Sequence, residues 1–283
     1  MLIIGGLVVG LAACSTLRLS YNQGPTLAYW WADRYVDFDD GQSAKVRQVL
    51  ADWFRWHRAT QLADLGAVVA RARADAAGTL SPAQVCRFAD DLSQRALRAY
   101  EHAVPAIAEI APTLRPEQIR NIERRQAKNN RGYVDDHLQP DPELRQREAV
   151  KRMIKRAEDY YGSLDDNQRA LVARRTAASP FDAQVSLAER RARQQDTLAS
   201  LRRWSADKPP PETVRAELLQ LGQRVRQSPR EPYRAYQQRL LEHNCAFIAE
   251  LHNSTNAEQR QHLIRKLGSW EADIRTLVAD LEG

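Results

Sequence analysis

The sequence predicts an all-α protein, in which long antiparallel helices joined by short capped turns form an elongated bundle or cradle. Glycine and proline are scarce, with 12 and 13 among 283 residues, and runs of β-branched residues are nearly absent. Apolar residues recur every three or four positions through long segments, which is the period of an amphipathic helix. In addition, one short helix-start pattern recurs along the chain.

The helix-start pattern is clearest at 80–84, where Ser81 can cap a helix and Pro82 can take its first position. Gln84 follows the cap by three residues, so its side chain can accept a hydrogen bond from the backbone N–H of Ser81 and complete a capping box. Variants of this pattern occur at 38–42, 114–118, 164–168 and 255–259. Each variant precedes a segment with helical periodicity and therefore indicates a helix start.

Residues 14–24 are expected to form a polar tether, followed by an aromatic-rich helix over 25–36. Its aromatic residues, Trp30 and Trp31 among them, would lie either at a membrane interface or in the protein core, and we favour the core. Periodic apolar residues then predict one helix over 39–77, which would be more than about 50 Å long at ~1.5 Å per residue.

The next helix is predicted over 81–110, with a kink at Pro105. The helix that follows the 114–118 pattern has few apolar residues. Its basic side chains form a stripe at three- and four-residue spacing: Arg120, Arg124, Lys128 and Arg131, with Arg125 beside them. Because like charges repel at this spacing, such a stripe is either solvated, which is the more common case, or faces an anionic group or a protein client. We therefore treat these five residues as the candidate binding face.

Further helices are predicted in the second half of the chain: 143–161, which is again basic, 164–178, 182–204, 212–227, 232–251 and 257–281. The Lys-Pro-Pro-Pro segment at 208–211 is the strongest linker signal, because consecutive prolines are stiff and extended. It separates a main helical domain, 25–206, from C-terminal helices, 207–283, that we expect to pack on the main domain.

Residues 2–13 form an uncharged apolar run that ends in Leu-Ala-Ala-Cys. The run is shorter than the ~20 residues that span a bilayer, and small residues precede the cysteine, as at the cleavage site of an export signal. This ending resembles the lipobox of bacterial lipoproteins, which implies a signal peptide over 1–13 and a fatty-acylated Cys14. Ser15 implies the outer membrane, by resemblance to lipoprotein sorting rules. The alternative is an ordinary signal peptide with a chance cysteine, and no lysine or arginine precedes the run.

The formal net charge is +6. A basic surface often binds nucleic acid, but an exported protein meets none in the periplasm, so we expect no such partner. The available partners are the membrane, through Cys14, anionic envelope components, and unfolded or outer-membrane protein clients. The other two cysteines, Cys86 and Cys245, either pair in this oxidising compartment or remain as buried free thiols.

No catalytic constellation is evident, so we expect no enzyme, cofactor or metal site. The six histidines never occur at the i, i+4 spacing of a helical metal site. A glycine-rich phosphate loop, a nucleophile elbow and a Cys-x-x-Cys motif are absent from the sequence. An envelope enzyme remains a third hypothesis, because a helical fold can bring distant ionisable side chains together.

The segments 80–84, 114–118 and 164–168 resemble the Leu-Thr-x-x-Gln repeats of the Spy and CpxP type of periplasmic helical proteins, although none has threonine at the second position. That resemblance implies a helical cradle and a chaperone or envelope-stress role. Residues 20–33 and 53–58 resemble an uncharacterised family of proteobacterial lipoproteins that has no established activity.

The first functional hypothesis is therefore a lipid-anchored periplasmic binding protein at the outer membrane, chaperone-like or related to envelope stress. It would hold its clients non-covalently on a basic helical face. The alternative is a structural or assembly lipoprotein that recognises an envelope component such as lipopolysaccharide or peptidoglycan.

Overall fold

The computed structural model describes residues 16–280 and confirms the all-α class, since no strand occurs in this range. The predicted signal peptide over 1–13 and the acylated Cys14 lie outside the described residues. The described part of the chain contains twelve α-helices and one 3-10 turn: α1 Thr16–Asn22, α2 Gly24–Val36, α3 Asp40–Thr60, α4 Leu62–Asp75, α5 Pro82–Ile110, η1 Ala111–Thr113, α6 Pro116–His137, α7 Pro142–Tyr161, α8 Asp166–Ala177, α9 Ala183–Asp207, α10 Pro211–Arg226, α11 Glu231–Asn253 and α12 Ala257–Ala279.

All five copies of the helix-start pattern begin a helix. In four of them the capping side chain accepts from the backbone N–H of the glutamine, whose side chain accepts from the N–H of the cap: these caps are Asp39, Ser81, Asp165 and Asn256. In the fifth, an arginine side chain offers no acceptor. Helix α6 therefore has only one of the two hydrogen bonds of a capping box, in which the N–H of Arg115 donates to Oε1 of Gln118 at 2.8 Å.

The path of the chain is a long hairpin of helices. It runs out through α4, α5, α6 and α7, and returns beside itself in reverse order, with α8 on α7, α9 on α6, α10 and α11 on α5, and α12 on α4. Side-chain bonds fix the antiparallel direction of the α6–α9 pair. Ser205 at the end of α9 donates to the carbonyl of Leu114, before the start of α6, at 2.5 Å. Further along, Asn130 donates to Gln194 at 2.7 Å.

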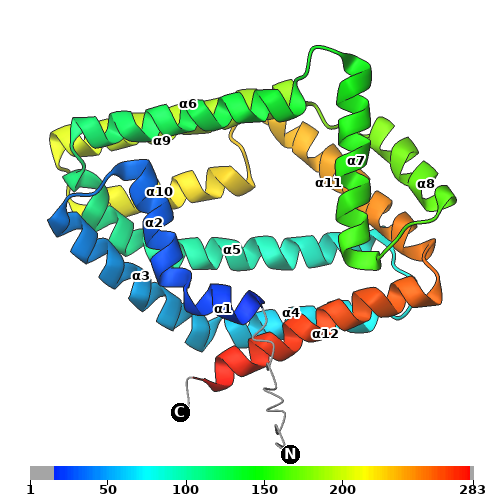
Figure 1. Cartoon of the computed structure of the whole chain (residues 1–283). Helices are drawn as coiled ribbons and strands as arrows, with labels where there is room; N and C mark the ends of the chain where they lie inside the picture. Colours follow the sequence, from blue (N-terminus) through cyan, green and yellow to red (C-terminus); the bar gives the residue numbers. More distant parts are fainter. Residues whose placement is uncertain (1–15, 281–283) are drawn as a thin grey trace, which may run out of the picture.

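These helix pairs are arranged as a closed frame (Figure 1). One side is formed by α6 and α9, the next by α7 and α8, the third by α4 and α12, and the fourth by α2 and α3, while α5 crosses the frame. The sequence predicted the helices and their antiparallel pairing. Closure into a ring is a property that the helical pattern alone did not indicate.

Two reciprocal glutamine pairs join helix starts that are far apart along this path. Gln118 donates to Gln42 at 2.6 Å, and Gln42 donates back at 3.3 Å, where α6 meets α3. Gln168 and Gln259 exchange two hydrogen bonds of 2.8 Å where α8 meets α12. In four of the five copies the glutamine of the helix-start pattern therefore has two roles, because it caps its own helix and also joins that helix start to another.

The ring contains two separate hydrophobic cores. The α12 core combines side chains of α4, α7, α8, α11 and α12, including Leu62, Val172, Leu251, Leu267 and Leu277. The α9 core combines the end of α5 with α6, α9 and α10, including Val104, Ile119, Leu198, Trp204 and Val214. Each core forms where several helix pairs converge, so apolar burial is concentrated on two sides of the frame.

Two segments have a structure that differs from the one predicted from the sequence. The described part of the expected tether, 16–24, is helical except for the turn at Gln23, and the hydroxyl of Tyr21 in α1 is hydrogen-bonded to Nδ1 of His57 on α3 at 2.8 Å. The single helix predicted over 39–77 is interrupted at Gln61, between α3 and α4. Just before this break, the hydroxyl of Thr60 donates to the carbonyl of Trp56 at 2.9 Å, a contact that tends to bend helices.

The prediction that the α2 aromatics lie in the core was wrong for two of them. Tyr29 is buried and its hydroxyl donates to Ser43 at 2.9 Å, but Trp30 and Trp31 are exposed. The helix periodicity was correct, yet it did not reveal which face of α2 meets α3.

The predicted linker at 208–211 is a tight turn between α9 and α10. Lys208 ends α9 in the left-handed conformation, with φ of 47°. The helices after this turn pack along α5 and α4 as part of the same ring.

Candidate binding cavity

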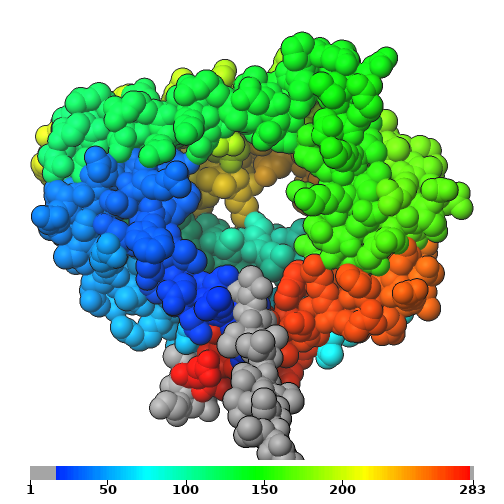
Figure 2. Space-filling view, viewed as in Figure 1, coloured from blue at the N-terminus to red at the C-terminus, as the bar shows by residue number. Residues whose placement is uncertain are grey.

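The ring encloses a cavity of about 1960 Å³. Its walls come from α4, the first part of α5, α7, α11 and α12, together with the connection between α8 and α9. Figure 2 shows that the centre of the ring is hollow, with α5 visible through the opening between α2, α6 and α7. The helix pairs therefore lie too far apart for their side chains to fill the middle of the molecule.

The cavity has a substantial apolar lining. It includes Phe88 and Leu92 from α5, Met153 from α7, Phe181 from the α8–α9 connection, and Phe247 and Ile248 from α11. Phe181 and Ile248 are each 46% exposed, although large apolar side chains are normally covered by protein. Exposed apolar side chains gathered in a concavity are typical of a binding surface.

Arginine is the dominant charged residue of the lining: Arg71, Arg87, Arg145, Arg152, Arg156 and Arg175. Two of these pair with carboxylates, Arg71 with Asp91 at 2.7 Å and Arg175 with Glu250. The other four make no salt bridge within the described residues.

Four aspartates also line the cavity, but three of them already have partners. Asp91 pairs with Arg71, Asp90 is bound by Arg226 of α10 at 2.7 Å, and the side chain of Asp182 caps α9. The lining therefore has an excess of positive charge that protein carboxylates do not neutralise.

Three of the four arginines without a salt bridge belong to one stripe of α7. Arg145, Arg152 and Arg156 are separated by seven and four residues, with Ala149 and Met153 between them on the same face. The sequence showed that this helix is basic but not that its basic face lines a cavity. The sequence feature that could have indicated a cavity-lining face was the presence of apolar residues, Ala149 and Met153, between the arginines at helical spacing.

The histidine beside this stripe has a lowered pKa. Nη2 of Arg152 lies 3.4 Å from Nδ1 of His137. Burial lowers the pKa of His137, and the positive charge of Arg152 lowers this pKa further. The positive charge at this position therefore belongs to Arg152, which stays available to an anionic group.

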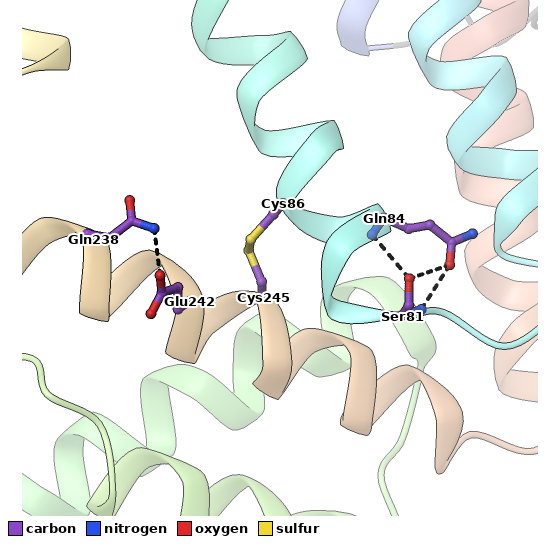
Figure 3. Close-up of a disulfide and its surroundings, with 6 residues drawn as sticks. All are labelled: Ser81, Gln84, Cys86, Gln238, Glu242 and Cys245. Carbon is purple, nitrogen blue, oxygen red and sulfur yellow. Dashed lines mark hydrogen bonds between the residues drawn. A yellow bond between two sulfur atoms is a disulfide. The ribbon is translucent and has the colours of Figure 1, made fainter.

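A disulfide joins two walls of the cavity. Cys86 and Cys245, for which the sequence left pairing and free thiols as alternatives, are bonded, with Cα atoms 5.5 Å apart and a separation of 159 residues. Figure 3 shows this bond between α5 and α11, close to the capping box of Ser81 and Gln84. Neighbours of the bond, Phe88 and Ile248 among them, line the cavity. The disulfide therefore fixes the relative position of the α5 and α11 walls.

A buried histidine holds the same corner. Nε2 of His252 lies 2.9 Å from the carbonyl of Gly78, and Nδ1 lies 3.1 Å from the hydroxyl of Tyr161. A neutral ring satisfies both contacts, by donating through Nε2 and accepting through Nδ1. Burial accordingly lowers the pKa of His252, and burial raises the pKa of Tyr161 to about 12. This contact links α11 and α7 to the turn between α4 and α5.

The candidate face predicted on α6 lies apart from this cavity. Arg120, Arg124, Lys128 and Arg131 are exposed and Arg125 is half-buried, and none of the five lines the large cavity. Arg131 lines a smaller pocket of about 450 Å³, together with Arg191 of α9. The structure thus places the arginines of α7, rather than those of α6, beside exposed apolar side chains.

This lining is suited to non-covalent binding, through apolar contact and charge-assisted hydrogen bonds from guanidinium groups. Within residues 16–280, no cluster of three His, Cys, Asp or Glu side chains is placed to hold a metal ion. Among the helices of the described range, none combines the length and apolar character needed to cross a membrane.

Comparison with known proteins gives one match. Residues 34–234 match the DUF6279 family, which is described as a family of unknown function. No curated protein and no solved structure matches the chain. The resemblance of the helix-start pattern to the Spy and CpxP type therefore has no support from these comparisons.

Proposed function

The chain belongs to the DUF6279 family, whose function is unknown, and we propose that it is a lipid-anchored periplasmic binding protein. In this proposal, the cavity holds exposed segments of unfolded or outer-membrane proteins, as a chaperone-like or envelope-stress protein would. The anchor is the acylated Cys14 that the lipobox resemblance implies, and the outer membrane is the expected location.

One observation carries the proposal: a cavity of about 1960 Å³ in which exposed apolar side chains alternate with arginines that have no carboxylate partner. Pockets for small molecules usually occupy about 300–1,000 Å³, so this cavity suits a larger ligand such as a chain segment. Apolar side chains of the client would contact Phe181 and Ile248, while its carboxylates would bind the arginines of α7. Such contacts are reversible and need no reaction.

The test is suppression of client aggregation by a soluble body that lacks residues 1–14. Light scattering of a reduced, aggregating client is followed at an equimolar ratio. We expect suppression by the unmodified body and loss of suppression in the Phe181→Ser/Ile248→Ser variant. The matched control is Leu219→Ser/Val225→Ser, because these two apolar side chains are exposed on α10 and do not line the cavity. Absence of suppression in the unmodified body, or equal suppression by both variants, contradicts the proposal.

The arginines without a salt bridge favour a second candidate, a structural or assembly lipoprotein that recognises lipopolysaccharide or peptidoglycan. Its test compares two triple charge reversals, Arg145→Glu/Arg152→Glu/Arg156→Glu on α7 and Arg120→Glu/Arg124→Glu/Lys128→Glu on α6. This candidate is favoured if the protein captures the purified component in a salt-sensitive way and only the α7 variant loses this capture. The unmodified protein should then also fail to suppress client aggregation. If only the α6 variant loses capture, the binding face is the basic stripe of α6 that the sequence indicated.

A further inference from the structure

Exposed apolar side chains are concentrated at the N-terminal end of the described chain. Four large apolar side chains in residues 16–280 are more than half exposed: Leu19 at 59%, Trp30 at 57%, Trp31 at 65% and Val225 at 58%. Three of these four belong to α1 and α2, where Leu27 is also exposed. Tryptophan side chains are large and usually covered, so two adjacent exposed indoles need a physical explanation.

The exposed residues of α2 form one stripe. Leu27, Trp30, Trp31 and Arg34 follow the i, i+3, i+4, i+7 spacing that places side chains on one face of a helix. We define the α2 stripe as these four residues. Arg34 is exposed in the last turn of α2 and forms no salt bridge within the described residues. The stripe therefore combines an apolar surface with one free positive charge at its end.

The rest of α2 is held firmly against the ring. Gly24 packs so closely on α3 that an added Cβ would lie 2.3 Å from the ring of Phe54. Tyr29 is buried, and the guanidinium of Arg47 lies 3.5 Å from the centre of its ring. Because these contacts fix the inner side of α2, the helix cannot rotate to bury the two indoles.

One of the two exposed indoles is also supported by a neighbouring ring. The ring of Trp31 lies 4.8 Å from that of Tyr35, whose hydroxyl accepts a hydrogen bond from Asn129 of α6. Trp31 therefore stacks against a side chain of its own helix that α6 holds in place, while most of the surface of Trp31 remains uncovered. This arrangement presents the α2 stripe as a preformed surface.

The chemistry of the α2 stripe fits the head-group region of a lipid bilayer. Tryptophan prefers this region because its ring is apolar and its N–H is polar, and arginine binds anionic head groups. A second copy of the chain fits less well. The three apolar side chains of the stripe offer roughly 400 Å² of exposed surface, whereas a stable interface buries about 800 Å² on each partner.

The position of the stripe in the sequence also favours the membrane. Only α1, about 10 Å long at 1.5 Å per residue, separates residue 15 from the start of α2. A chain anchored at Cys14 therefore holds the α2 stripe close to the lipid surface. We infer that Leu27, Trp30 and Trp31 insert into the bilayer interface, with Arg34 at the head groups, and that this second contact fixes the orientation of the ring on the membrane.

The inference rests on the membrane anchoring of the proposed function but not on client binding. Its test uses the full chain with excess vesicles of phosphatidylglycerol and phosphatidylethanolamine, whose acyl chains are brominated in one series. Bromine quenches tryptophan emission only at close contact. The chain has six tryptophans, so the emission of the Trp30→Phe/Trp31→Phe variant is subtracted from that of the unmodified chain to obtain the emission of these two indoles.

We expect the Trp30 and Trp31 emission to shift to shorter wavelength with vesicles and to be quenched in the brominated series. Leu219→Ser/Val225→Ser, on α10, should leave both effects unchanged. A blue shift without quenching would mean that protein covers the indoles, and this result overturns the inference. Emission with neither shift nor quenching would mean that the indoles stay in water, and it overturns the inference as well.

Sedimentation with the vesicles separates this result from a failure of the anchor. The Trp30→Ser/Trp31→Ser variant should still sediment, because Cys14 alone retains it, while its orientation becomes less restricted. Full-chain protein that neither sediments nor shows quenching refutes both the anchor and the inserted stripe. Full-chain protein that sediments without quenching refutes the stripe alone.

Discussion

The two hydrophobic cores of the ring are built from similar helix pairs but have different surroundings. The α9 core is closed, with Trp204 fully buried at its centre and donating to Glu217 at 2.8 Å. The α12 core forms one wall of a large open cavity, and a disulfide and a buried histidine hold that wall in place. The closed side is held by packing and by side-chain hydrogen bonds such as that of Ser205 to Leu114, whereas the open side also has a disulfide and a fully buried histidine. Each prediction below tests that difference.

The largest effect is expected from removal of the disulfide. The Cys86→Ser/Cys245→Ser variant should lose about 2–4 kcal/mol of stability, because a long loop is released in the unfolded chain. Hydrogen exchange should show earlier opening of α5 and α11 beside the cavity, while α6 and α9 retain protection. Urea unfolding gives the stability change. Equal loss of protection on both sides of the ring would show that the two cores do not differ in this way.

A smaller effect is expected at the glutamine pairs. Gln168→Ala removes both hydrogen bonds that the buried Gln259 shares with Gln168 and leaves Gln259 its bond to the carbonyl of Ser163, which should cost about 1–3 kcal/mol. Gln118→Ala should cost less, because its partner Gln42 is only half-buried and water can replace the lost bond. Thermal unfolding of the two variants provides the comparison. A greater loss in Gln118→Ala would mean that the corner beside the α9 core depends more on polar ties.

The smallest effect is the pH dependence that the buried histidine of the α12 core contributes. Burial lowers the pKa of His252 in the folded protein below its ordinary value of 6.5. As the pH falls through 6.5, the unfolded chain binds a proton that the folded chain does not, so stability should decrease until the folded pKa is reached. The decrease should be shallower in His252→Gln.

Chemical denaturation between about pH 7 and pH 5 measures this slope. His57 and His137 also have lowered pKa values, so part of the slope should remain in the variant. His57→Gln, which lies outside the α12 core, should also make the decrease shallower and serves for comparison. An unchanged slope in His252→Gln would show that this histidine does not contribute to the pH dependence of stability.

Local chemistry made much of the fold predictable. Ser81 and Gln84 start α5 as expected, since a capping box involves only residues within one turn. The apolar period of 257–281 likewise predicted α12, whose inner side chains, such as Leu267 and Leu277, are buried. The interruption at Gln61 was missed because the apolar period continues through it.

The candidate site was less predictable, because the sequence shows that charged residues share one face of a helix but not what that face meets in the folded protein. The stripes of α6 and α7 are both basic at helical spacing, although the α7 stripe has more apolar residues between its arginines. Only packing decides that Arg152 and Arg156 line the cavity while Arg120 and Arg124 do not. The exposure of Trp30 and Trp31 was misjudged for the same reason, since helical spacing defines a face without defining what covers it.

By itself, the sequence determined that this chain is helical, where its capped helices begin, and which residues share a face, because capping and periodicity act within a few residues. The tertiary structure alone decided that the helices close into a ring, that Gln168 and Gln259 meet, and that the arginines of α7 face a cavity. These features depend on contacts between residues that are distant in the chain, and no local pattern specifies such contacts.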